Sequence, residues 1–265
     1  AFDILGNESS KTATVQVVPQ SESGNALSFD GTDDYVGVAD SPTLDLTNAV
    51  TIIAWVNPTS NGGTILAKRD YFLNFEDKNV VKFQFNYDNS VLGKIVGVSS
   101  IPLNKWSHVA LTYDKQEIKI YINGVLDKTE QETDSLTPND NIVSIGSLVR
   151  GSAAPIDEFN GIIDEVAIWS DGLSAAEVTA LYNSGTALDA RSNSGDYSST
   201  DNLKGYWKME DGSGTTLTDV SGYANDGTIN GASWTTGVAS TSYDNTPKVV
   251  DTTAPGVPSG LSATA

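Results

Sequence analysis

The sequence contains no cysteine and only one histidine in 265 residues. Disulfide bonds are therefore excluded, and a zinc site or another site for a soft metal would lack its usual ligands. Any metal ion should be held by oxygen atoms instead. Long hydrophobic runs are also absent, because no stretch approaches the ~20 apolar residues of a membrane-spanning helix. Membrane insertion is therefore not expected.

Basic residues are scarce, since 15 Lys and Arg stand against 34 Asp and Glu and give a net charge of −19. Nucleic acids and anionic membranes are bound through clusters of Lys and Arg, so neither is expected as a partner. The charge fits an extracellular protein and favours divalent cations. Solubility alone is the alternative explanation for it.

Short segments of alternating hydrophobicity dominate the chain, and Gly, Asn, Asp, Ser and Pro separate them. This pattern predicts an all-β sandwich of two antiparallel sheets. The candidate strands are residues 51–56, 82–87, 106–113, 117–122 and 142–146. Asn123 and Gly124 follow one of these strands directly, and this pair is typical of a hairpin turn with two positive φ angles.

One short helix is expected. Ser174 is a good N-cap residue, and Glu177 three positions later completes a capping box. Val178, Leu181 and Tyr182 form an apolar stripe with helical spacing. A glycine at position 185 suits the end of the helix.

Two segments far apart in the chain carry an acid where a strand would face a core. They are residues 26–36 (ALSFDGTDDYV) and 161–169 (GIIDEVAIW). Strict alternation predicts that Ile162, Asp164, Val166 and Ile168 share one face. A buried carboxylate is costly unless it is paired, hydrogen-bonded or bound to a metal.

These two segments belong to a series that continues with TIIAWVNP, KWSHVALTYD and IYINGVL. The series resembles the laminin-G-like jelly-roll domain of the concanavalin A-like lectins and glucanases, over residues 24–184. One segment departs from that pattern. Residues 203–234 resemble a part that precedes ALSFDG in the family, but here they follow the helix. Either they are a truncated second copy, or the domain is circularly permuted and residues 203–236 complete the same sandwich; we expect completion.

The ends of the chain resemble parts of fibronectin type III modules. We therefore expect a piece of a longer multidomain protein, with a preceding module or linker at residues 1–20. The jelly roll would span residues 21–240, and residues 241–265 would begin the next module.

The resemblance implies a calcium ion on the convex side of the sandwich. Calcium takes six to eight oxygen ligands, which carboxylates and backbone carbonyls supply. Carried over to this chain, the family pattern implicates Asp164, with Gly24 and Asn25 as backbone donors. Glu210 or Asp211 is expected to add a carboxylate, and Asp30 is a further candidate. Alternatively, Asp164 caps a loop through backbone N–H groups without any metal.

Catalysis is not expected. Glycoside hydrolases need two carboxylates placed across the scissile bond, and the E-x-D-x-x-E strand of the glucanases is absent. The acids at 157–158 and 164–165 are adjacent pairs, so their members should point to opposite faces of an extended strand. The single histidine, His108, is expected to pack in the core with a satisfied hydrogen bond. A G-x-S-x-G elbow is also absent.

The leading hypothesis is therefore an extracellular, calcium-stabilised, monomeric and non-catalytic module for glycan binding or adhesion, whose partner is a glycan, including acidic ones, or a cell-surface protein. The first alternative is a structural spacer or a protein-binding module without glycan specificity, and the second is a polysaccharide-active enzyme with an unrecognised site. The residues expected to contact the ligand lie in segments that look like loops and strand edges, namely Tyr71, Tyr87, Arg150, Lys68 and Arg69.

Overall fold

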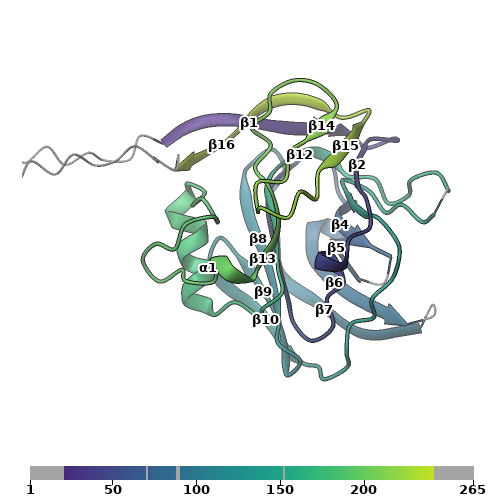
Figure 1. Cartoon of the computed structure of the whole chain (residues 1–265), viewed down its shortest axis with the longest axis vertical. Helices are drawn as coiled ribbons and strands as arrows, with labels where there is room; N and C mark the ends of the chain where they lie inside the picture. Colours follow the sequence, from purple (N-terminus) through teal and green to yellow (C-terminus); the bar gives the residue numbers. More distant parts are fainter. Residues whose placement is uncertain (1–20, 70, 88–89, 152, 242–265) are drawn as a thin grey trace, which may run out of the picture.

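The computed structural model describes residues 21–69, 71–87, 90–151 and 153–241. Within these residues two antiparallel eight-stranded sheets face each other as a jelly-roll sandwich (Figure 1). Seven strands of the first sheet follow the order β10 (Val125–Gln131), β9 (Glu117–Ile122), β8 (Ser107–Tyr113), β3 (Val50–Pro58), β12 (Asn160–Trp169), β1 (Ser21–Asp30) and β16 (Ser233–Thr241). The eighth strand, β13 (Leu203–Trp207), also pairs with β12.

The second sheet supplies the other half of the core. Its order is β14 (Thr216–Leu217), β15 (Gly227–Asn230), β2 (Tyr35–Val38), β11 (Val143–Ile145), β4 (Thr64–Lys68), β5 (Tyr71–Glu76), β6 (Val80–Tyr87) and β7 (Ser90–Ser100). The all-β prediction is confirmed. The regions that resemble fibronectin modules, residues 1–20 and 242–265, lie outside the described residues.

Alternation along β9 shows how the sequence builds this core. Ile118 and Ile120 point between the sheets, whereas Lys119 points away from the core. The hairpin that follows is formed as predicted, because Asn123 and Gly124 have φ angles of 50° and 75°.

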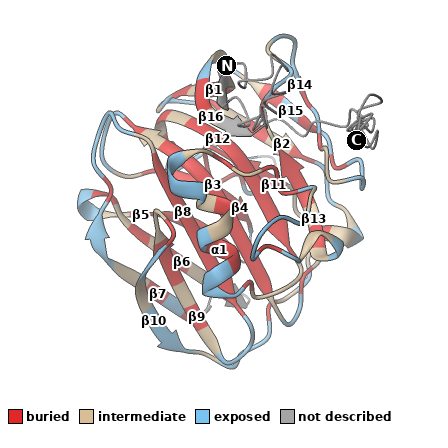
Figure 2. Ribbon diagram, turned by 90° about the vertical axis from the view of Figure 1, so that its left-hand side faces the viewer, coloured by how far each residue is buried: buried red, intermediate tan, exposed pale blue. Residues whose placement is uncertain are grey.

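The helix α1 (Ala175–Tyr182) covers the outer face of the first sheet, meaning the face turned away from the second sheet (Figure 2). Its capping box is confirmed, since Ser174 accepts from the backbone of Glu177 and the Glu177 carboxylate accepts from the backbone of Ser174. The prediction for Gly185 is wrong, because the helix already ends at Asn183 in the left-handed conformation. In the described part of the chain no helix is long and apolar enough to cross a membrane.

Residues 203–241, which we call the return segment, contribute strands to both sheets. β13 pairs with β12 and β16 pairs with β1 in the first sheet, while β15 pairs with β2 in the second. Trp207, Leu217 and Ile229 are buried in the main core between the sheets. The segment therefore fills the sandwich and does not stand apart from it.

The prediction that Ile162, Asp164, Val166 and Ile168 share one face is wrong, and a β-bulge in the middle of β12 explains why. Asp164 pairs with Trp55 while Ala167 pairs with Ile53, so β12 uses three residues where β3 uses two. Glu165 is the extra residue and has a φ of 51°. Such a bulge reverses the alternation after it. Ile163, Val166 and Ile168 consequently face the core, and Asp164 lies on the outer face.

Candidate functional site

Asp164 is 1% exposed and ties two strands together. Its Oδ2 accepts a hydrogen bond from the Val238 N–H of β16 at 2.9 Å, and its Oδ1 accepts from the Glu165 N–H at 2.8 Å. Burial raises the pKa of Asp164 well above its usual value, and the neighbouring charges of Glu165 and Glu210 raise it further. A carboxylate in this position gains from any positive charge nearby.

Glu210 approaches the same place from the end of β13. Its Oε2 accepts from the Asn25 N–H at 3.1 Å, and its carboxylate occupies the space that a Cβ at Gly24 would need. Gly237 makes the opposite side equally tight, because a Cβ there would meet both the carbonyl oxygen of Asn25 and Oδ2 of Asp164. Oxygen atoms of Asp164, Glu210 and Asn25 thus lie close to Gly24 and Gly237, where a side chain would not fit.

The structure brings together four of the five predicted metal ligands, namely Asp164, Glu210, Asn25 and Gly24. Their carboxylate and carbonyl oxygens form the donor set that calcium prefers, so these residues fit such an ion. Two backbone N–H groups also satisfy Asp164, as the metal-free alternative expects, although each carboxylate oxygen can accept more than one contact.

Asp30 does not join this group. It lies at the far end of β1, opposite Asn160, whereas Ile163 beside Asp164 pairs with Leu27. The three residues of β1 from Leu27 to Asp30 span roughly 10 Å. Asp30 instead sits with Asp33 and Asp34, where the three carboxylates come within 4.8 Å of one another. Asp30 therefore does not share a site with Asp164, and its role as a metal ligand stays a prediction.

A second buried network adjoins Asp164. The bulge turns Glu165 to the outer face as well, where its Oε2 accepts a hydrogen bond from the Tyr206 hydroxyl. Burial raises the pKa of Glu165 to about 7 against the opposing effect of Lys208. Asp189 forms a two-bond ion pair with Arg191, at 2.9 and 2.6 Å, and lies 3.3 Å from Lys208 Nζ. This network could not be predicted from the sequence, because strict alternation places Asp164 and Glu165 on opposite faces.

His108 lies near this network and is completely buried. It packs against Trp55 and Tyr182, with ring centroids 5.4 and 5.8 Å away, which agrees with the predicted packing role. Neither ring nitrogen finds a hydrogen-bond partner among the described residues, so the expected hydrogen bond is not seen. Burial lowers the pKa of His108 to about 3.

A polar hollow of about 480 Å³ opens on the other sheet, over the ends of β4, β5 and β6. Its lining includes Asn74, Glu76, Lys82 and Asp157. Oδ2 of Asp157 accepts from Thr64 Oγ1 at 2.8 Å and from Asn74 Nδ2 at 2.9 Å. This fixes the Asn74 amide and leaves its Oδ1 without a partner in the described structure, although Asn74 is only 6% exposed.

Opposite charges meet at the rim of this hollow. Lys82 Nζ lies 2.7 Å from Glu76 Oε2, and the hydrogen bond to Lys82 lowers the pKa of Glu76. The sequence analysis missed these residues, but a signal was present. Leu73 and Phe75 of β5 face the core, so the polar residues that alternate with them must face outward.

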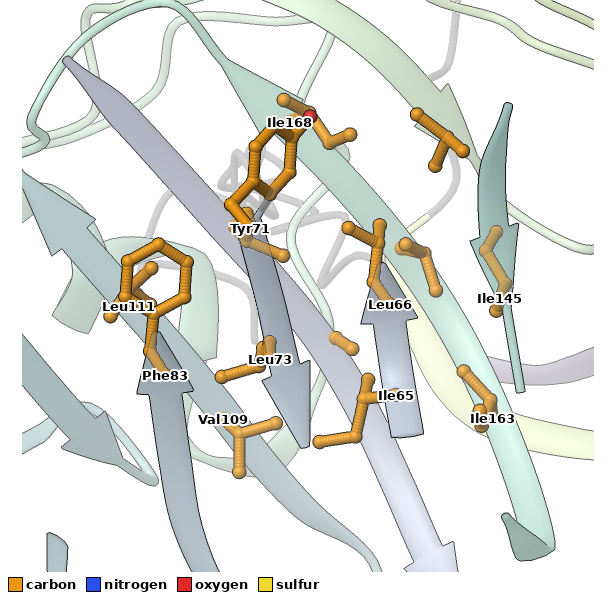
Figure 3. Close-up of a cluster of buried hydrophobic side chains, with 14 of the residues drawn as sticks. Ile65, Leu66, Tyr71, Leu73, Phe83, Val109, Leu111, Ile145, Ile163 and Ile168 are labelled. Carbon is orange, nitrogen blue, oxygen red and sulfur yellow. The ribbon is translucent and has the colours of Figure 1, made fainter. Parts of the chain in front are cut away.

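Two of the predicted ligand-contacting residues are in the wrong environment. Tyr71 is 2% exposed and points between the sheets among Ile168, Leu66 and Leu73 (Figure 3). Lys68 is buried as well, with Nζ at 2.5 Å from Asp40 and 3.2 Å from Asp45. Alternation along these strands turns both side chains inward, so neither can reach a ligand at the surface.

The other three predicted ligand contacts remain untested. Arg69, which follows β4, and Arg150, in the loop after β11, are both exposed. Tyr87 ends β6, and its side chain lies outside the described residues.

The chain folds as a two-sheet jelly-roll sandwich in which a buried carboxylate joins β12 to β16 of the first sheet. Residues 30–179 match the family model described as the concanavalin A-like lectin/glucanases superfamily, and the chain belongs to this family. No curated protein sequence matches the chain.

Solved structures share the fold. One is a protein from Bacteroides ovatus with a provisional assignment as carbohydrate-binding, similar with a TM-score of 0.65 at 21% identity, over 83% of this chain and 61% of that one. The chain thus spans about three fifths of that relative's length. Another is the CBM40 module of the Ruminococcus gnavus IT-sialidase bound to α2,3-sialyllactose, with a TM-score of 0.49 at 20% identity, over 62% of this chain and 100% of that one.

Proposed function

We propose that this chain is a non-catalytic module that binds a glycan in the polar hollow of the second sheet. The observation that carries the proposal is the ordered polar lining of the hollow, where Asp157 fixes the Asn74 amide and Lys82 pairs with Glu76. Polar groups held in this way suit sugar hydroxyls, because little is lost in ordering them on binding. The provisional assignment of the relative from Bacteroides ovatus agrees with this class of ligand.

The charges of the hollow favour a neutral sugar. Glu76, Asp77 and Asp157 line it together with a single cation, Lys82. A sugar that carries its own carboxylate would be repelled there. The hydroxyls of a neutral sugar can donate to the carboxylates and accept from Lys82.

The same residues argue against hydrolysis. A glycosidase needs one carboxylic acid that stays protonated near neutral pH. Lys82 lowers the pKa of Glu76, which is the opposite of what such an acid requires. The acids with raised pKa values in the described structure are Asp34, Asp164 and Glu165, and none of them lines the hollow.

The proposal includes a structural calcium ion held by Asp164, Glu210 and the carbonyl groups of Gly24 and Asn25. When bound, the ion would supply positive charge and hold these ligands in place. The residues themselves link β1, β12, β16 and the end of β13. We place the module outside the cell, where calcium sites of roughly 10⁻⁴–10⁻³ M affinity are filled.

Binding in the hollow is tested with Asn74→Ala, which removes the amide that Asp157 fixes in the lining. A glycan array probed with the wild type identifies a ligand, and isothermal titration measures its affinity for each variant. We expect Asn74→Ala to weaken binding roughly tenfold, since a lost hydrogen bond of this kind costs about 1–2 kcal/mol. Asn230→Ala on β15, outside the hollow, is the matched control and should bind as the wild type does. A blank array together with binding to a partner protein would support the protein-binding alternative.

The calcium site is tested by thermal melting with calcium and with a chelator. At tenfold excess over its dissociation constant the ion adds about 1.4 kcal/mol, which corresponds to a rise in Tm of about 4 °C for a domain of this size. Glu210→Gln should abolish that rise while it keeps an acceptor for the Asn25 N–H. Asp30→Asn at the far end of β1 should leave the rise intact. Equal melting of the wild type with calcium and with chelator would rule out the ion.

A further inference from the structure

A second pocket, of about 310 Å³, lies where the return segment meets the loop before β3. One wall is formed by residues 42–49, and the other by Lys204 of β13 and Tyr223. Ser170, at the end of β12, also lines it. The pocket therefore exists only when the return segment is in place.

Hydrogen bonds brace both walls. The Asn225 side chain donates to Thr43 Oγ1 at 3.0 Å and to the Lys204 carbonyl oxygen at 2.9 Å, so one amide joins the two walls. Asp219 accepts from the N–H groups of Ser221 and Asn225, both at 2.9 Å, and so fixes the turn that carries Tyr223. A pocket braced in this way needs little ordering when a ligand binds.

The side chains at the pocket combine an aromatic ring with a positive charge. Tyr223 is 42% exposed. Lys204 Nζ lies 2.9 Å from the Tyr223 hydroxyl, 3.4 Å from the Asp201 carbonyl oxygen and 4.8 Å from the ring centroid. None of these contacts of Lys204 in the described structure is with a carboxylate. Asp45, the acid of the opposite wall, is already paired with Lys68 at 3.2 Å.

We propose that this pocket binds a sugar residue that carries one carboxylate, such as a hexuronic acid, and the proposal rests on the glycan-binding function proposed above. Lys204 receives the carboxylate, and the exposed part of the Tyr223 ring packs against the sugar. Thr47 and Asn48 of the other wall face solvent and can bond its hydroxyls. The pocket offers one lysine for one carboxylate, and the net charge of −19 on the chain disfavours further negative charge on the ligand. The pocket therefore fits an isolated uronic acid in an otherwise neutral glycan.

The test is an NMR titration of the ¹⁵N-labelled protein with three probes: methyl β-D-glucuronide, methyl β-D-glucoside and acetate. We expect the glucuronide to shift the amide signals of Lys204 and Tyr223, and to bind at least tenfold more tightly than either other probe. Lys204→Gln should weaken glucuronide binding at least tenfold without lowering Tm. Lys82→Gln in the polar hollow is the matched control and should leave glucuronide binding unchanged.

Three results would overturn the proposal. Unchanged glucuronide binding by Lys204→Gln would remove the role of the lysine. Equal binding of acetate and the glucuronide would show a general anion site. Loss of glucuronide binding in Lys82→Gln alone would place the sugar in the polar hollow, so that glycan binding there would stand while this inference, and the preference of the hollow for a neutral sugar, failed. Conversely, if the glucuronide binds at Lys204 and Asn74→Ala does not weaken binding of the array ligands, the proposal that the hollow binds the glycan would fail. The proposal for the pocket at Lys204 would then be supported.

Discussion

A chain that stops before Leu203 is expected to lose its cooperative fold. Without the return segment, β12 and β1 each lose a hydrogen-bonded neighbour, and β2 loses its partner β15. The main core also loses Trp207, Met209, Leu217 and Ile229. Truncation of one such buried side chain costs about 2–5 kcal/mol, so losing all four costs as much as or more than the total stability of about 5–15 kcal/mol for a typical domain.

Circular dichroism and urea unfolding of residues 21–202 test this expectation. The single variant Trp207→Ala should retain the fold but lose about 3–5 kcal/mol, because the ring is completely buried and its Nε1 donates to the Asn225 carbonyl. A chain that ends at Thr241 is the control and should unfold like the full chain. Co-expression of residues 203–241 should restore the fold of the shortened chain. A sharp unfolding transition of residues 21–202 alone would show instead that the return segment is dispensable.

Glu165→Gln is expected to stabilise the protein at alkaline pH. In the folded chain the pKa of Glu165 is about 7, chiefly because the carboxyl is buried. In the unfolded chain it should lie near 4.3. The folded state therefore holds its proton more tightly, and this group loses stability as the pH rises from the lower value to the higher one. The full loss at pH 8 is on the order of 3 kcal/mol.

The measurement is the difference in unfolding free energy between Glu165→Gln and the wild type, in chelator, from pH 5 to pH 8. That difference should be small at pH 5 and approach about 3 kcal/mol in favour of the variant at pH 8. The difference is needed because His108 acts in the opposite direction. Its pKa is lowered to about 3, so His108 costs stability as the pH falls below about 6.5. A constant difference across this range would show that Glu165 is ionised throughout.

The sequence predicted the architecture well because alternation and turn residues act locally. The strands, the Asn123-Gly124 hairpin and the capping box at Ser174 all depend on neighbours within a few residues. The sandwich and the jelly roll follow from those elements together with the family resemblance.

The errors arose in two ways. A β-bulge reversed the alternation of the residues that follow it, and the burial of other residues depended on segments far away in the sequence. The bulge at Glu165 leaves no clear mark in GIIDEVAIW, yet it decides which face each later residue occupies. Lys68 was expected at the surface because its segment looks like a loop or a strand edge. Its partners, Asp40 and Asp45, come from the segment before β3, and only the fold brings them together. The four clustered metal candidates came from the resemblance, since no local pattern joins Asn25 to Glu210.

The pairing of β1 with β16 also determines how the module would respond to tension. Ser21 lies opposite Thr241, and Glu22 lies opposite Ser240, so both ends of the described chain leave the sandwich side by side. A pull applied at Ser21 and Thr241 would open the two strands like a zipper, one pair at a time. After a few pairs, the separation of the strands would reach Val238 and Asn25. Their N–H groups donate hydrogen bonds to Asp164 and Glu210, respectively. The mechanical strength of the module should therefore depend on these two carboxylates, and on any proton or ion that they hold.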